Sequence, residues 1–168
     1  MIEYREALVE EVDELKRILW KHGPNEWNYL TEEGVEAEFA LIEQARARAV
    51  VATVNQEIVG FAVLITGEAS PDYLTKYGKL EEMTFIGDVV VSSDHSGLGI
   101  ATRLLNECIT RSEKTNAKKV LIERHEENLA SAGMMKKAGF KIIDTLHEPQ
   151  KRTAGSQNSV ILEFCIEE

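Results

Sequence analysis

The chain has 168 residues, of which 43% are apolar and 29% charged, and its formal net charge is −10. This composition is ordinary for a globular protein, and we expect one domain over residues 1–168. The acidic balance argues against a nucleic-acid partner, which would require a basic face. No apolar run approaches the ~20 residues that span a bilayer, so we expect no membrane partner.

The two cysteines, Cys108 and Cys165, lie outside any CxxC or Cys/His spacing. The sequence therefore predicts no zinc or other metal site. A reduced, cytoplasmic setting fits this cysteine usage. The first residues form no apolar signal segment, which agrees with a cytoplasmic protein.

The first half of the chain predicts a strand, two helices and a hairpin. Residues 2–5 form a short β-rich run, and apolar residues at a helical period predict helices over 7–20 and 31–46. Two β-rich runs, 47–54 and 58–66, are separated by a short polar turn typical of a hairpin. A long loop is expected over 67–79.

The second half predicts alternating strands and helices. Strands are expected over 83–91, 119–124, 140–146 and 159–166, and helices over 98–114 and 128–138. Gly139 closes the last helix. The polar stretch 148–158 is expected to be a mobile connection. This order predicts a mixed α/β sheet covered by helices, in which antiparallel strands precede a right-handed βαβ unit.

The most informative stretch is 87–105, where a β-branched run meets a loop that carries Gly97 and Gly99 and opens directly into a helix. Free backbone N–H groups at such a helix start, together with the positive end of the helix dipole, suit a phosphate. The chain is therefore expected to bind a phosphorylated cofactor.

Two common phosphate-binding patterns fit this loop poorly. A nucleoside-triphosphate loop requires GxxxxGK[ST], whose spacing and lysine are missing. A dinucleotide fingerprint requires a third glycine where this chain has Thr102, although Glu123 supplies an acidic residue near the end of the next strand. Too little chain remains for the further βα units of that fold, so a dinucleotide enzyme is the weaker alternative.

A third pattern fits the loop and its surroundings together. Ser96-Gly97-Leu98-Gly99-Ile100-Ala101 follows Val89-Val90-Val91, and Asn128 and Gly139-Phe140 lie downstream. In these features the chain resembles the GNAT superfamily of acetyl-coenzyme A-dependent N-acetyltransferases, whose loop is Gln/Arg-x-x-Gly-x-Gly/Ala. The resemblance covers nearly the whole chain. It implies the GNAT-like acyl-CoA N-acyltransferase fold, an α/β architecture with about seven strands and about four helices.

The resemblance implies acetyl-coenzyme A (acetyl-CoA) as cosubstrate, with its pyrophosphate on the glycine loop. The strand before the loop would pair with the pantetheine arm, and a backbone N–H of Val89 or Val90 would stabilise the oxyanion of the tetrahedral intermediate. The residues implied to bind the cosubstrate are Val89, Val90, Val91, Ser96, Gly97, Leu98, Gly99, Ile100, Ala101, Thr102, Asn128 and Met135.

Two residues depart from the family pattern. Ser96 replaces the usual Gln or Arg of the loop, which removes a long polar side chain but keeps the backbone N–H groups. Met135 stands where many family members have a tyrosine as general acid, and methionine cannot donate a proton. This second departure leaves open a non-catalytic acyl-CoA-binding sensor or regulatory protein as the alternative to an enzyme.

The implied reaction is direct attack of a primary amine on the thioester, for which the amine must lose a proton. Glu82, at the expected start of the fourth strand, is the first candidate base, because the family often has a glutamate on that strand. Asp88 and His125 are the other catalytic candidates, since both are expected beside the acetyl site. Each also has an ordinary interpretation without a catalytic role. Glu82 would be a solvated acid, Asp88 a paired structural acid, and His125 an exposed histidine at the end of a strand.

The acceptor is expected to be a small-molecule amine or a protein amine, and the sequence does not identify it. In family members the first helices and the long loop line the acceptor site. In these segments this chain has five aromatic residues, Trp20, Trp27, Tyr29, Tyr73 and Tyr77. Trp20 continues an apolar helix face and fits a core position better. The last strands often mediate dimers in the family, so a homodimer is a further expectation.

Overall fold

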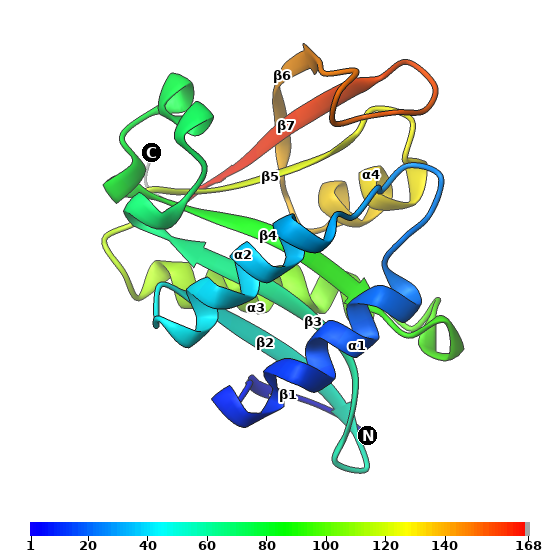
Figure 1. Ribbon diagram of the computed structural model, residues 1–168. Coiled ribbons are helices and arrows are strands. Elements are labelled where there is room, and N and C mark those ends of the chain that lie inside the picture. The colour runs from blue at the N-terminus through cyan, green and yellow to red at the C-terminus, as the bar shows by residue number, and fades with distance from the viewer. Residues whose placement is uncertain (167–168) are drawn as a thin grey trace.

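The computed structural model describes residues 1–166, which form a seven-stranded mixed sheet with helices on both faces (Figure 1). The strand order is β1-β2-β3-β4-β5-β7-β6. The strands are β1 Ile2–Glu6, β2 Ala47–Val54, β3 Glu57–Thr66, β4 Met83–Val91, β5 Lys119–His125, β6 Lys141–His147 and β7 Asn158–Cys165. The helices are α1 Val12–His22, α2 Glu32–Glu43, α3 Ile100–Glu113 and α4 Leu129–Lys137.

These elements confirm the expected α/β class and element order. β1 to β4 pair antiparallel in sequence, and β4 and β5 are parallel neighbours joined through α3. The β2–β3 turn is built from Asn55 and Gln56 at φ of 51° and 69°, the left-handed pair that a tight hairpin requires. The segment 67–79, expected to be a loop, contains two short 3-10 turns, Gly67–Ala69 and Asp72–Tyr77.

Two apolar cores lie on opposite faces of the sheet. α1 and α2 cover one face, and α2 packs there through Val35, Phe39 and Ile42 at helical spacing. α3 and α4 cover the other face and bury Leu104, Cys108 and Met135 among their core residues. Cys108 is fully buried, as its place on the apolar helix face predicts. Trp20, expected in the core, is instead 42% exposed on α1.

The sheet is continuous at one end of the β4–β5 pair and open at the other. β5 pairs with β4 from Met83↔Lys119 to Ile86↔Ile122, and the pairing stops there. On its other edge β4 remains paired with β3 as far as Val91. The last five residues of β4 therefore present an unpaired backbone edge in the middle of the sheet.

A β-bulge lies where this separation begins. Leu64 pairs with Ile86, whereas Val63 pairs with Asp88, so Gly87 is the extra residue on β4. The bulge shifts the side-chain alternation by one position, and Val90 consequently packs in the core beneath α1 and α2. Asp88, two residues before Val90, points to the same face.

No helix within residues 1–166 has both the length and the apolar character needed to cross a bilayer.

Candidate active site: a cleft between β4 and β5

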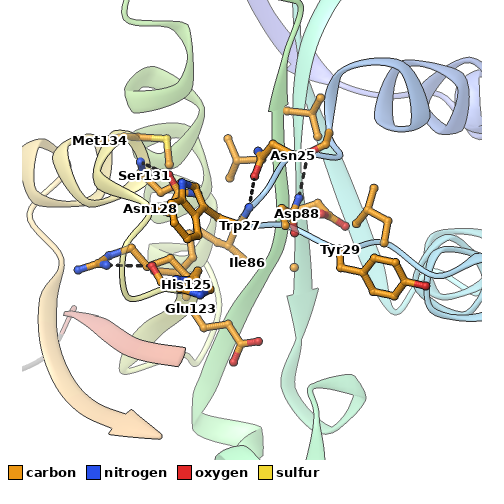
Figure 2. A pocket seen from close by; sticks show the side chains of 18 of the residues that line it. Asn25, Trp27, Tyr29, Ile86, Asp88, Glu123, His125, Asn128, Ser131 and Met134 are labelled. Atoms are coloured by element: carbon orange, nitrogen blue, oxygen red, sulfur yellow. Dashed lines mark hydrogen bonds between the residues drawn. The ribbon is translucent and has the colours of Figure 1, made fainter. Parts of the chain in front are cut away.

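A cleft of about 310 Å³ lies where β4 and β5 separate. The separated ends of both strands form its floor, and α4 contributes one wall. The segment between α1 and α2 and the connection between β6 and β7 close it from the other face. Figure 2 shows Trp27 projecting from the α1–α2 segment toward His125, with Asp88 nearby on its strand.

The open edge of β4 can hold an extended ligand. Val89, Val90 and Val91 all line the cleft, and β5 does not pair with them. Because alternate residues of a strand direct N–H and C=O groups to the same edge, this stretch can hydrogen-bond an amide-containing chain as a neighbouring strand would. The expected pantetheine position therefore has a free backbone edge.

The glycine loop leaves the start of α3 without a side-chain cap. Gly97 and Gly99 both have φ of 77°, a left-handed conformation that glycine adopts without strain. An added Cβ on either residue would have no atom within 4 Å, so their surroundings are open. Thr31 caps α2 and Asn128 caps α4, whereas Gly99 has no side chain to cap α3. The first N–H groups of α3 are thus available to an anion.

The other residues expected to bind the cosubstrate are spread around the loop and α4. Ser96, Leu98 and Gly99 are exposed, Ala101 and Thr102 are partly buried, and Ile100 is buried in the core. The Ser96 hydroxyl donates to the Ser93 carbonyl at 3.1 Å.

Asn128 and Met135 both line the cleft from α4. The side-chain oxygen of Asn128 accepts the Ser131 N–H at 3.2 Å, so this residue also begins the helix. Met135 is 3% exposed and packs in the core beneath α4.

Asp88 lines the cleft and is paired with a carboxyl that the sequence analysis missed, Glu38 of α2. Glu38 reaches the β4 bulge beside Gly87, where an added Cβ would collide with its Oε1 atom. Burial raises the pKa of both acids, and the Asp88 carboxyl raises that of Glu38 further. The hydrogen bond from Glu38 acts in the opposite direction on Asp88 and favours its ionised form.

A signal for Glu38 was present in the sequence. It lies three residues after Val35 and four before Ile42, on the buried face of α2. An acid on the apolar stripe of a helix is unusual unless it has a partner. The sequence could not say that the partner would be Asp88, because α2 and β4 are far apart along the chain.

Glu82 does not lie at this cleft. The structure places it in a 3-10 turn, Leu80–Glu82, rather than in the fourth strand. It stands at the end of β4 where that strand is still paired with β5, and its carboxylate forms an ion pair with Lys118 at 2.6 Å. The Lys118 hydrogen bond lowers the pKa of Glu82. This placement favours the ordinary interpretation of Glu82, a solvated acid at the edge of a strand, although the structure adds Lys118 as its partner.

His125 lines the cleft, but it is buried rather than exposed, and both ring nitrogens are engaged. Nε2 lies 2.6 Å from the Ala154 carbonyl, which can only accept, so Nε2 carries the proton. Nδ1 accepts the Glu127 N–H at 3.0 Å. The ring also packs against Trp27, with centroids 4.8 Å apart. His125 therefore joins three segments of the cleft wall and has no nitrogen left for proton transfer.

The connection after β6, expected to be mobile, folds onto the cleft. Lys151 and Arg152 both contact the Glu123 carboxylate, and Arg152 Nε donates to Ser159 Oγ at 2.9 Å. Tyr73 donates its hydroxyl to the same carboxylate at 2.6 Å. Burial, and then the charge of Glu123, raise the pKa of Tyr73, which keeps that hydroxyl protonated.

The two remaining tyrosines that were expected at the acceptor site differ in their position. Tyr29 lines the cleft and is 69% exposed, whereas Tyr77 donates its hydroxyl to Asp144 at 2.7 Å outside it. Over residues 1–166, no group of three or more His, Cys, Asp or Glu side chains is arranged to hold a metal ion.

A family model described as the acetyltransferase (GNAT) family matches residues 12–140. No curated protein sequence matches the chain significantly.

Many solved structures share the fold. One is a Bacillus subtilis acetyltransferase in complex with CoA, with a TM-score of 0.74, 18% identity and 99% of each chain covered. A second is the Escherichia coli ribosomal-protein-S18-alanine N-acetyltransferase, with a TM-score of 0.75 and 15% identity over 100% of this chain and 96% of that one. A third is the IAA acetyltransferase from Bacillus cereus, with a TM-score of 0.75 and 14% identity over 99% of this chain and 100% of that one.

Proposed function

The chain belongs to the acetyltransferase (GNAT) family, and from this we propose how its own residues hold acetyl-CoA and activate the acceptor. It is an enzyme that transfers acetyl from acetyl-CoA to an amine. The observation that supports our assignment of roles is the unpaired edge of β4, which begins beside Asp88 and is followed by the glycine loop and the uncapped start of α3.

For the cosubstrate, we propose that the pyrophosphate lies on the N–H groups of residues 97–102 and that the pantetheine arm pairs with Val89 and Val91. The left-handed glycines and the open space around them support this placement. The thioester would then lie near Asp88, with a backbone N–H of Val89 or Val90 directed at its oxygen. Asn128, beyond its capping role, would use its amide N–H groups on the pantetheine.

For the chemistry, we propose that Asp88 is the general base. The Asp88 carboxylate takes a proton from the cationic amine, the neutral nitrogen then attacks the thioester carbon, and the C–S bond breaks to release the CoA thiolate. The second proton of the nitrogen is lost to solvent as the amide forms. His125 and Glu82 take no part in this step, because their polar atoms are engaged elsewhere. Met135 supplies no proton to the thiolate, so protonation of the leaving group comes from solvent.

For the acceptor, we propose entry from the face covered by the α1–α2 segment. Asp88, Trp27 and Tyr29 line that side of the cleft, and a carboxylate beside aromatic rings suits a cationic amine. The acceptor is a small amine or a protein amine, and one structural neighbour is named for a ribosomal-protein alanine, a protein amine.

The proposal is tested by measuring CoA thiol release with a panel of amines. Spermidine, lysine, glucosamine and a peptide with a free amino-terminal alanine cover the main acceptor classes. We expect release with at least one class and at least about 100-fold slower turnover in Asp88→Asn, within the usual contribution of a general base. Tight acetyl-CoA binding without thiol release from any amine would instead support the sensor that Met135 suggests.

We also propose a homodimer formed through the last strands. β6 is an edge strand of the sheet, and its Ile142 and Ile143 are 59% and 37% exposed. Light scattering on the purified protein would test this, with Ile142→Lys expected to give a monomer.

Two further expectations stay proposals. One domain over residues 1–168 is supported by the single sheet that joins all seven strands. A reducing, cytoplasmic setting is supported by Cys108 and Cys165, which are both unpaired thiols.

A further inference from the structure

We propose that Glu38 is a positioning residue whose protonated carboxyl holds Asp88 as an ionised base facing the cleft. The inference rests on the proposed function, since Glu38 acts only through Asp88. It adds a residue of α2 to a reaction otherwise assigned to β4 and the glycine loop.

The two carboxyls occupy different positions relative to the cleft. Asp88 lines it, whereas Glu38 is not among the lining residues and reaches Asp88 from α2. The space for Glu38 exists because Gly87 has no side chain at the bulge. Phe39, the neighbour of Glu38 in α2, is fully buried and fixes the helix against the sheet.

The pair requires a proton. With both acids ionised, the buried Oε2 atom of Glu38 has no hydrogen-bond partner among the residues that the structure describes. Two carboxylates in contact also repel one another in a poorly solvated site. A proton on Glu38 removes both problems, because the carboxylic acid then donates to Asp88.

The surrounding charges do not replace this proton. The other titratable groups along the cleft are His22, Tyr29, Glu123, Arg124, His125, Lys151 and Arg152. Lys151 and Arg152 contact Glu123, whereas Arg124 donates through Nη1 to the carbonyls of His125 and Glu126. Both nitrogens of His125 are engaged. His22 accepts the Ser93 N–H at 3.3 Å, and Lys16 of α1 pairs with Glu36 at 2.8 Å. Burial and the mutual interaction of Glu38 and Asp88 are what shift the pKa of both acids.

The arrangement has a chemical consequence for the base. Glu38 stays protonated throughout, while Asp88 accepts the proton of the attacking amine and later releases it to solvent. A donor behind Asp88 keeps its carboxylate charged in a site where burial alone would favour the neutral acid. The base is thereby ready when the cationic amine arrives.

The test compares Glu38→Gln with Glu38→Leu in the full chain, using the amine panel above and initial rates from pH 5 to 9. Glutamine keeps a neutral N–H donor toward Asp88, so kcat at pH 7 is expected to stay within about threefold of wild type. Leucine removes the donor, and we expect kcat to fall at least about tenfold and its acid limb to move up by about one pH unit. The KM for acetyl-CoA should not change in either variant.

Equal loss of activity in both variants, with the acid limb unmoved, would show a purely structural role and overturn the inference. So would an unchanged kcat in Glu38→Leu. Failure of the proposed function has a different signature, namely no thiol release by the wild-type protein with any amine.

A second measurement needs no acceptor. Carbon-13 NMR of the labelled side-chain carboxyls should show Glu38 titrating well above the ordinary value of about 4.3, and shifting downward in Asp88→Asn. An ordinary titration of Glu38 in the wild-type protein would contradict the shared proton whatever the enzyme assay gives.

Discussion

Single residues decide whether the glycine loop can accept a phosphate. Gly99 combines a left-handed backbone, open surroundings and a place at the start of α3, where the first N–H groups have no cap. The spacing of the two glycines was readable in the sequence, and so was the adjoining strand. The absence of a cap was not, since it depends on where the helix begins.

Gly99→Asp is expected to weaken acetyl-CoA binding by roughly several hundred-fold, measured by calorimetry. Two unit charges about 4 Å apart interact by about 4 kcal/mol near a protein surface, and about 1.4 kcal/mol is tenfold in Kd. Gly99→Asn is the matched control, because asparagine tolerates the left-handed backbone and carries no charge. Similar weakening by both variants would place the phosphate elsewhere.

His125 is a residue whose role changed between sequence and structure. Strand position alone predicted a catalytic candidate or an exposed histidine, and neither describes the buried ring that links Ala154, Glu127 and Trp27. Its partners come from the connection after β6 and the α1–α2 segment, which no local pattern assigns to it.

We expect His125→Asn to raise the KM for the amine several-fold while leaving kcat within about threefold, because the acceptor wall loosens and the base is untouched. Steady-state kinetics at saturating acetyl-CoA would measure this. A fall in kcat of about 100-fold with an unchanged KM would return His125 to a catalytic role.

At the scale of elements, β4 carries most of the site. Its limits, residues 83–91, were predicted correctly from the β-branched run. Its bulge at Gly87 was not predicted, although a glycine inside a strand often marks one. The bulge matters because it directs Asp88 to the α2 face, where Glu38 meets it. The misplacement of Glu82 has a related cause, since a 3-10 turn ends one residue before the strand begins.

Gly87→Ala tests the bulge. The added methyl group collides with the Glu38 carboxyl, so we expect a loss of about 1–3 kcal/mol in the free energy of unfolding. Urea titration would measure this loss. In the double variant Gly87→Ala, Glu38→Ala the collision is relieved, and the cost of the glycine substitution should largely disappear. Additive losses would mean that the two residues do not touch in solution.

At the scale of the whole molecule, two apolar cores support the sheet, and the partly buried Glu38–Asp88 pair lies beside one of them. Glu38 has a folded-state pKa above its ordinary value, so its contribution to stability is complete at low pH and is lost as pH rises through the folded pKa. The overall class could be predicted because element order alone specifies a mixed sheet. The Glu38–Asp88 pair could not be predicted, because it joins α2 to β4 through tertiary packing.

Glu38→Gln is therefore expected to raise the midpoint of thermal unfolding by at least about 2 °C at pH 8, and by progressively less toward pH 4. Glutamine resembles the protonated acid at every pH, so the variant avoids the loss that wild type undergoes. Thermal melts across this range would measure the difference. A constant or inverted difference would mean that Glu38 is ionised in the folded protein.

Because the pairing of β4 with β5 stops after Ile86, a bound cosubstrate would also complete the sheet. β1–β4 and β5–β7–β6 are two half-sheets that share four residue pairs, and an extended molecule in the gap would join them along the rest of β4. Cosubstrate binding then resembles the last step of assembly, in which a missing strand is supplied from outside. Amide hydrogens on the open edge of residues 87–91 should exchange rapidly in the free protein and slow down when acetyl-CoA is present, as the two half-sheets become one cooperative unit.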